Sequence, residues 1–315
     1  MTCIHAATVA SIRKLLPALV AAGLILGTIP AAQAVPPAGY VMRFAEEFDG
    51  WGVDFTHKWD THWVAWNVRH LAGNNDQSIK AADWERLRGG KTVGELLRKS
   101  KKLPRKRNYL HQVGRGKLKM RAWPVPDDLR YEFWGFPFVA GMLAGPRAHA
   151  QTYGYWETRL RLKKIGKGQH FALWLLPTDN SWPPEVDMLE AVSGDGWLYT
   201  NTHVKDGVAP PINWFKPPRR PDAWMTVGFE WTPKEMIWTI DGKQVRRHTA
   251  NIGAKPMYPL FSWEVGSNWP GWIDSSTPWP AEVVVDYLRV YEKEKKGEPM
   301  AVSPTLVSDD DEEED

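Results

Sequence analysis

The sequence contains very little cysteine: Cys3 is the only one in 315 residues. A chain with one thiol cannot form an internal disulfide, and it offers no cysteine pair for a zinc site. Gly-rich phosphate-binding loops and His-Glu-x-x-His segments are also missing from the sequence. These absences exclude the common phosphate-loop, zinc-protease and disulfide-scaffold classes. We therefore expect no cofactor to be required for catalysis.

Long hydrophobic runs are missing except at the N-terminus. There, Arg13-Lys14 precedes an apolar stretch over 15–29, and Ala32-Gln-Ala34 follows it. This order is typical of a secretory signal peptide cleaved after Ala34, and a permanent membrane anchor is the weaker interpretation. We expect residues 1–34 to be removed, together with Cys3, and the bacterial protein to be secreted or periplasmic without stable membrane insertion.

Three carboxylates lie within the six residues Glu185-Val-Asp-Met-Leu-Glu190. In a β-strand, Glu185 and Asp187 point to one face and Glu190 to the other. One extra residue, a β-bulge between Asp187 and Glu190, would return all three acids to a common face. Retaining glycosidases use two carboxyl groups only about 5–5.5 Å apart, which neighbours on one strand face can provide.

A helix start is the alternative for this segment, because proline followed by acids is common in a first helical turn. Ser193-Gly-Asp-Gly196 follows the acids, and an alternating run comes next, from Trp197 to Val204. That order favours a hairpin with a four-residue turn, and hence the strand interpretation.

Several ordered segments resemble glycoside hydrolase family 16, and together they cover about residues 44–291. The matching segments are Phe44–Gly50, Arg69–Gln77 (with Asp76 where Glu is commoner), Gly141-Met-Leu, Tyr153–Arg159, Glu185–Glu190 and Val285–Tyr291. The resemblance implies an all-β jelly roll, a sandwich of two curved antiparallel sheets with an open substrate cleft. Recurrent short runs rich in Val, Ile, Tyr, Trp and Thr agree with an all-β sandwich.

The resemblance also implies roles for individual residues. Glu185 would be the nucleophile, Glu190 the general acid/base, and Asp187 a hydrogen-bonding group between them. Glu185 would be ionised, whereas Glu190 would keep its proton until the leaving oxygen takes it. His203 is expected beside the cleft, and Asp286 is a candidate ligand for a structural Ca²⁺.

Tryptophan is unusually abundant, with 19 residues in the chain. Sugar rings stack on aromatic planes, so Trp174 and Trp182, close to the acids, are candidate substrate contacts, with core packing as the alternative. Four others are expected in the core: Trp51, Trp156, Trp231 and Trp238. Asn74, Asp76 and Gln77 are candidate ligands for sugar hydroxyls, although Asn-Asn-Asp also favours a simple turn.

Charge is distributed unevenly along the chain. A Lys/Arg-rich segment at about 84–108 looks like an insert in a catalytic domain spanning 35–295, and it contains a possible short helix at 92–100. The insert either borders the cleft and attracts an anionic polysaccharide or is a solvated loop. We expect residues 296–315 to be an acidic, disordered tail. We expect a monomer whose partner is a polysaccharide rather than nucleic acid.

Three functions remain open. The first is a secreted retaining endo-β-glycanase acting on a β-1,3 or β-1,3/1,4 glucan, and the second is a depolymerase or transglycosylase of a bacterial, possibly acidic, exopolysaccharide. The third is a carbohydrate-binding protein that has lost catalysis, which the intact acids argue against. Gln169-His-Phe and Ser262-Trp-Glu depart from the family pattern, so the nearby subsites are open to question.

Overall fold

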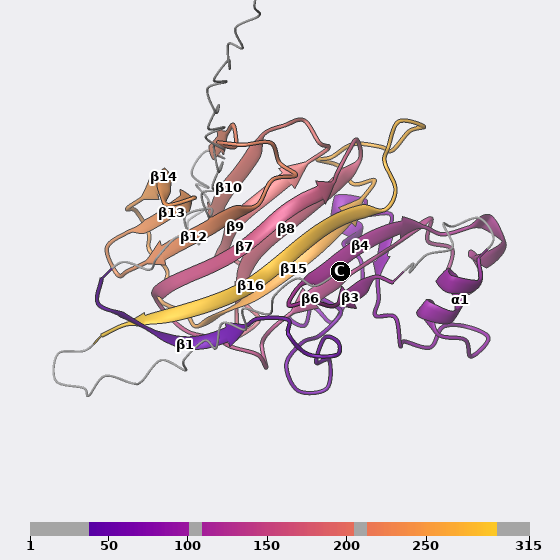
Figure 1. The fold of residues 1–315 in the computed structure, drawn as a ribbon, viewed down its shortest axis with the longest axis horizontal. Helices are drawn as coiled ribbons and strands as arrows, with labels where there is room; N and C mark the ends of the chain where they lie inside the picture. Colours follow the sequence, from indigo (N-terminus) through magenta and orange to yellow (C-terminus); the bar gives the residue numbers. More distant parts are fainter. Residues whose placement is uncertain (1–37, 101–108, 205–212, 295–315) are drawn as a thin grey trace, which may run out of the picture. The chain divides into compact units, whose positions relative to one another are not determined.

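Two β-sheets pack face to face in the computed structural model, which describes residues 38–100, 109–204 and 213–294 (Figure 1). The expected signal peptide and acidic tail, and 101–108 of the basic insert, lie outside the described residues. Within the described part, no helix has the length and apolarity that a membrane span requires.

The larger sheet has its strands in the order β14-β13-β12-β7-β16-β4-β5-β2, with β1 also on β16 and β3 also on β4. Its pairs are antiparallel except β2 with β5. Its strands are β1 (Tyr40–Glu46), β2 (Ser78–Lys80), β3 (His111–Val113), β4 (Leu118–Pro124), β5 (Phe138–Ala140), β7 (Gly154–Lys164), β12 (Met225–Trp231), β13 (Met236–Ile240), β14 (Lys243–His248) and β16 (Ala281–Lys293).

The smaller sheet is antiparallel throughout, in the order β11-β10-β9-β8-β15-β6. Its strands are β6 (Met142–Ala144), β8 (Gln169–Pro177), β9 (Glu185–Val192), β10 (Leu198–His203), β11 (Asn213–Phe215) and β15 (Met257–Val265). The described helices are α1 (Val93–Lys99) and the short 3₁₀ turns η1 (Ala72–Asn74) and η2 (Asp127–Leu129). The predicted two-sheet, all-β sandwich is therefore confirmed.

Strand β8 shows how the sequence positions the site. Phe171, Leu173 and Leu175 alternate into the core between the sheets, whereas Ala172 and Trp174 belong to a second apolar cluster on the opposite face. That second cluster contains the buried Trp63, from a segment before η1. The outer face of the smaller sheet is thus partly covered.

Tryptophan packing follows the sequence expectation at three of four positions. Trp156, Trp231 and Trp238 are buried in the core, as predicted. Trp51 is fully exposed, so its assignment to the core was wrong. It lies in a bend after Asp49-Gly50, beyond the end of β1, where no sheet face is available to bury it.

The basic insert forms more than a solvated loop. The helix predicted at 92–100 is α1, which begins with a capping box between Thr92 and Glu95. Val93, Leu96 and Leu97 pack in a satellite core that also contains Trp123. Apolar residues inside this basic segment therefore anchor it to the body of the domain.

Candidate active site

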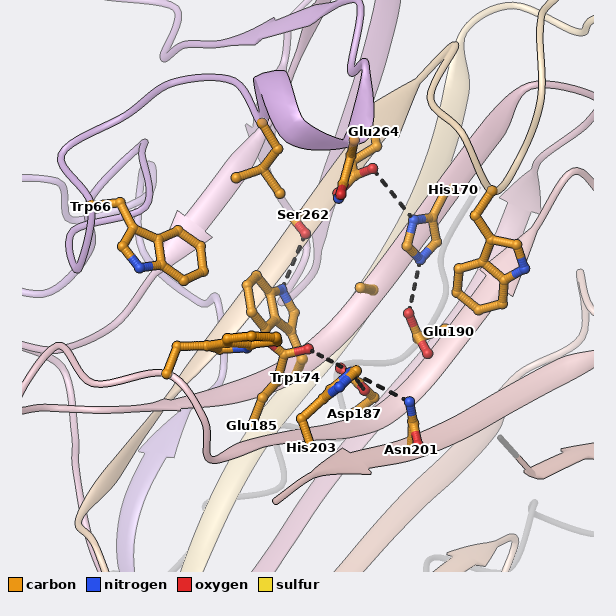
Figure 2. A pocket seen from close by; sticks show the side chains of 15 residues that line it. Trp66, His170, Trp174, Glu185, Asp187, Glu190, Asn201, His203, Ser262 and Glu264 are labelled. Atoms are coloured by element: carbon orange, nitrogen blue, oxygen red, sulfur yellow. Dashed lines mark hydrogen bonds and ion pairs between the residues drawn. The ribbon is translucent and has the colours of Figure 1, made fainter. Parts of the chain in front are cut away.

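The three acids of β9 face one side of the smaller sheet, as the sequence predicts (Figure 2). Leu173 of β8 pairs with Leu189 and the next residue, Trp174, pairs with Asp187, so Met188 is an extra residue in the ladder. This is the β-bulge expected between Asp187 and Glu190.

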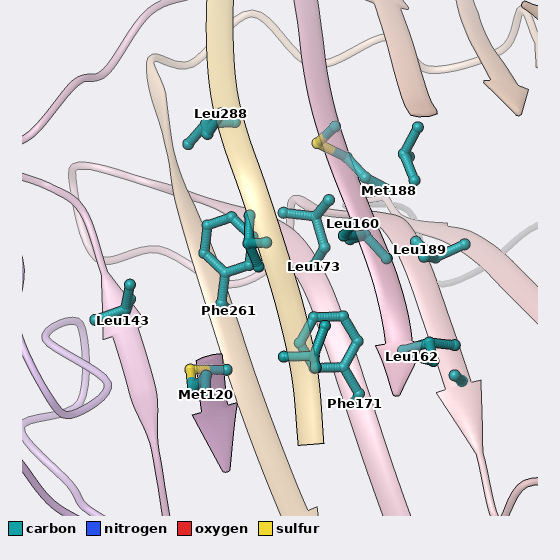
Figure 3. Close-up of a cluster of buried hydrophobic side chains, with 14 of the residues drawn as sticks. Met120, Leu143, Leu160, Leu162, Phe171, Leu173, Met188, Leu189, Phe261 and Leu288 are labelled. Carbon is teal, nitrogen blue, oxygen red and sulfur yellow. The ribbon is translucent and has the colours of Figure 1, made fainter. Parts of the chain in front are cut away.

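The bulge explains the common face. Met188 and Leu189 are consecutive, yet both are fully buried in the core between the sheets (Figure 3). Strict alternation would have sent one of them, and with it Glu190, to the wrong side. Apolar burial of two neighbours therefore fixes the position of the third carboxylate.

A cleft of about 470 Å³ opens over these acids. Four predicted substrate contacts lie in its wall: Asn74, Trp174, Trp182 and His203. Sequence reasoning missed further lining residues, namely Trp66, Leu71, His170, Ala172, Asn201, Ser262, Glu264 and Trp269. Trp182 is half exposed, as a sugar platform requires, whereas Trp174 is buried and donates from Nε1 to Ser262 Oγ at 3.1 Å.

Glu185 is held by two neighbours. Trp182 Nε1 donates to its Oε2 at 2.9 Å, and His203 Nε2 lies 3.3 Å from its Oε1. Burial nevertheless raises the pKa of Glu185 to about 8. The sequence predicts an ionised nucleophile, whereas burial keeps the proton on this carboxylate to higher pH than on an ordinary glutamate.

Asp187 is the most enclosed of the three acids. Burial, reinforced by the charges of Glu190 and Glu185, raises its pKa well above the ordinary range of an aspartate. Its backbone oxygen accepts a hydrogen bond from Trp238 Nε1 at 2.9 Å, which fixes the strand at this point. Asp187 therefore holds its proton to higher pH than an ordinary aspartate and can donate it in a hydrogen bond to Glu185.

Glu190 contacts a residue that the sequence did not assign. His170 Nε2 lies 3.1 Å from Glu190 Oε1, and His170 Nδ1 lies 3.9 Å from Glu264 Oε2. Both His170 and Glu264 belong to the two segments that depart from the family pattern. The sequence thus singled out the two segments that contain His170 and Glu264 but assigned no role to either residue.

Asp76 is not a ligand for sugar hydroxyls. Its side chain is fully buried and pairs with Lys80 Nζ at 2.5 Å, while Ser78 also donates to it at 2.7 Å. Neither Asp76 nor Gln77 lines the cleft, although Asn74 does. The short loop before β2 turns Asp76 inward because a buried lysine needs a counter-charge.

The residues around Asp286 do not suit Ca²⁺. This carboxylate pairs with Arg159, and Lys117 Nζ lies 3.5 Å from its second oxygen. Two cations thus occupy the position where a divalent ion would sit.

The described part of the basic insert, 84–100, contributes no side chain to the lining of the cleft. The interpretation in which the insert borders the cleft is therefore not supported by these residues.

Comparisons with known proteins bear on the family and the fold. Residues 140–289 match the model of "Glycosyl hydrolases family 16". Two curated relatives come from Rhizobium meliloti (strain 1021). The endo-1,3-1,4-beta-glycanase ExsH is 32% identical over 186 residues, covering 57% of this chain and 39% of that protein. The endo-1,3-1,4-beta-glycanase EglC is 30% identical over 179 residues, covering 56% and 38%.

The fold is shared with solved glucanases. The catalytic domain of an endo-1,3-beta-glucanase (laminarinase) from Thermotoga petrophila RKU-1 superposes with a TM-score of 0.63 at 21% identity, covering 81% of this chain and 99% of that one. Residues 140–289 therefore match the glycoside hydrolase family 16 model, and the chain has the β-jelly-roll fold, as its motifs predicted. It spans about two fifths of the length of the two curated relatives.

Proposed function

We propose that the protein is a retaining endo-β-glucanase acting on a β-1,3 or mixed β-1,3/1,4 glucan. The observation that carries this proposal is the bulge in β9, which turns Glu185, Asp187 and Glu190 into one cleft. Retaining hydrolysis needs a nucleophile and an acid/base close together on one side of the scissile bond. The relatives named endo-1,3-1,4-beta-glycanase support the same substrate class.

The chemistry follows in two steps. Glu185 attacks the anomeric carbon while Glu190 passes its proton to the departing glycosidic oxygen, which leaves a glycosyl ester on Glu185. Glu190, now a carboxylate, then takes a proton from water. The resulting hydroxide attacks the same carbon and frees Glu185, so that two inversions give net retention. Asp187 hydrogen-bonds Glu185 and so assists its departure from the sugar.

The charge of the cleft favours a neutral polymer. Four carboxylates line it, those of Glu185, Asp187, Glu190 and Glu264, and its described lining contains no lysine or arginine. An acidic exopolysaccharide would find no lysine or arginine to pair with in this lining, so the second function considered above is the weaker candidate. A lectin without catalysis would have no need for three aligned acids. The proposal includes export, with cleavage after Ala34, and action as a monomer without a cofactor.

The test is cleavage of a panel of polymers, measured as new reducing ends. Laminarin, mixed-linkage β-glucan, xyloglucan, agarose, carrageenan and an acidic exopolysaccharide are incubated with the wild type and with Glu185→Gln and Glu190→Gln. Glu294→Gln, which alters an exposed carboxylate at the end of the described chain, is the matched control. We expect the wild type and the control to cut the β-glucans and the two site variants to lose activity. Binding without cleavage by the wild type would contradict the proposal.

A further inference from the structure

A carboxylate, an imidazole and the acid/base carboxylate form a row across three neighbouring strands. Glu264 of β15 is directly opposite His170 of β8 in the ladder, and Glu190 of β9 is opposite Ala172, two residues further along. Because i and i+2 share a face, all three side chains point into the cleft. Figure 2 shows the imidazole between the two carboxylates, with contacts of 3.1 Å to Glu190 and 3.9 Å to Glu264.

The row is enclosed rather than solvated. Each of the three residues is less than a tenth exposed, and Trp269 covers the imidazole edge-on with ring centroids 5.1 Å apart. The charged groups that act on His170 are Glu190 from β9 and Glu264 from β15. The positive charge of the buried Lys80 of β2 acts in turn on Glu264. Low exposure keeps these charges from being screened by water and salt.

The charge state of the row follows from its contacts. Burial opposes protonation of His170, but the hydrogen bond with Glu190 and the negative charges of Glu190 and Glu264 outweigh it and raise the pKa of His170 to about 10. Burial likewise opposes ionisation of Glu264, but His170 and Lys80 lower the pKa of Glu264 to about 2. At neutral pH the row therefore contains an imidazolium anchored by an ionised Glu264.

We propose that His170, anchored by Glu264, is a positioning residue that orients Glu190 and stabilises its carboxylate once the proton has gone to the leaving oxygen. This inference rests on the proposed function. His170 stays protonated throughout the cycle: the only proton that moves in the first step goes from Glu190 to the glycosidic oxygen, and in the second step Glu190 takes one from water. His170 donates from Nε2 to Glu190 Oε1 in both states, and Glu264 acts on Glu190 through His170.

Kinetics of His170→Gln test the proposal. Glu185 and Asp187 titrate together, so removing the positive charge of His170 from the same cleft raises their apparent pKa values. The pH profile of kcat/KM on the polymer should then move to higher pH by about 1 unit, the lower end of the effect of a close charge. His57→Gln, which alters an exposed histidine outside the cleft, should leave the profile in place.

Leaving-group dependence provides a second readout. An aryl β-glucan oligosaccharide with an acidic phenol departs with little help from a general acid. On the natural polymer, whose leaving group needs that proton, His170→Gln should lose about 10–100-fold in kcat/KM, a part of what general acid catalysis supplies. When each enzyme is assayed at its own optimal pH, the loss on the aryl substrate should be under about threefold, because the nucleophile is then ionised in both enzymes. Equal losses on both substrates would point to misplacement of Glu185 and overturn the proposal.

A folding defect can be separated from this role. His170→Gln leaves two buried carboxylates without their cation, which is destabilising. The double variant His170→Gln with Glu264→Gln removes one of those charges, so it should melt at a higher temperature than the single variant. Its pH profile should stay displaced to higher pH, but by less than in the single variant, because the charge of Glu264 itself raises the pKa of Glu185.

Nitrogen-15 NMR of the histidine side chains tests the charge state without any substrate. The signals of His170 are identified by their absence in His170→Gln, and we expect an imidazolium at pH 8 in the wild type. A neutral His170 at pH 8, or an active wild type whose pH profile is unchanged by His170→Gln, would overturn the inference alone. A wild type that cleaves no polymer would overturn the proposed function and, with it, the role of His170.

Discussion

Trp182 Nε1 donates a hydrogen bond to Glu185 Oε2 at 2.9 Å, and the same indole is half exposed to the cleft. In the proposed function one side chain thus combines two tasks: it offers a ring to the sugar, and it lowers the pKa of the proposed nucleophile, which burial would otherwise raise further. Because a single substitution can remove the N–H and keep a ring, the two tasks are separable by experiment.

Trp182→Phe should therefore lower kcat more than it raises KM. A hydrogen bond to a charged group contributes about 1.5–3 kcal/mol, so the expected loss in kcat at neutral pH is about 10–100-fold. Trp182→Ala should in addition raise KM, since it removes the stacking surface. Steady-state kinetics on a soluble β-glucan distinguish the two variants. A KM effect without a kcat effect in Trp182→Phe would show that the hydrogen bond is unimportant.

The pH dependence of the wild type is a second prediction. Glu185 must lose its proton to act as a nucleophile, and burial raises its pKa to about 8 from the ordinary value of 4.5. Activity should accordingly rise as pH increases, and the rising limb of kcat/KM, which reports the free enzyme, should lie well above pH 4.5. Initial rates across a pH series at low substrate concentration measure this limb. A limb at or below pH 4.5 would contradict the buried environment of Glu185.

The pair of Asp76 and Lys80 should support stability rather than sugar binding. Both side chains are fully buried, so Lys80→Met leaves an unpaired charge and should cost about 3–5 kcal/mol of unfolding free energy. The double variant Lys80→Met with Asp76→Asn should recover part of that loss, and its KM should stay close to the wild-type value. Denaturant unfolding and kinetics provide the two readouts. A large rise in KM with unchanged stability would restore the sugar-binding interpretation of Asp76.

Adding Ca²⁺ should not raise the melting temperature of the protein by binding at Asp286. Its carboxylate pairs with Arg159 and lies near Lys117, so a divalent cation would have to displace two positive charges. Melting temperatures in a chelator and in millimolar Ca²⁺ should agree. A clear increase with Ca²⁺ that disappears in Asp286→Asn would show that the ion binds there after all.

Local pattern predicted the parts of the site that lie within one strand. The spacing of Glu185, Asp187 and Glu190, with the two apolar residues Met188 and Leu189, required a bulge if all three acids were to share a cleft, and the structure contains it. The helix of the insert was also readable, because its capping box lies within four residues of sequence.

The parts that sequence could not supply depend on register between distant segments. Glu264 meets His170 only because β15 and β8 align at that position, and no local signal fixes that alignment. Asp76 looked like a sugar ligand because nothing nearby in the sequence shows that Lys80 would be buried beside it. Trp51 was assigned to the core on composition alone, whereas its exposure follows from where β1 ends.

The most direct test of the account is the configuration of the first sugar released, observed by proton NMR while the wild type hydrolyses a mixed-linkage β-glucan. Double displacement through Glu185 predicts that the β-anomer appears first and the α-anomer only later, by mutarotation. Initial release of the α-anomer would mean a single displacement by water, and it would contradict the assignment of Glu185 as nucleophile and Glu190 as acid/base.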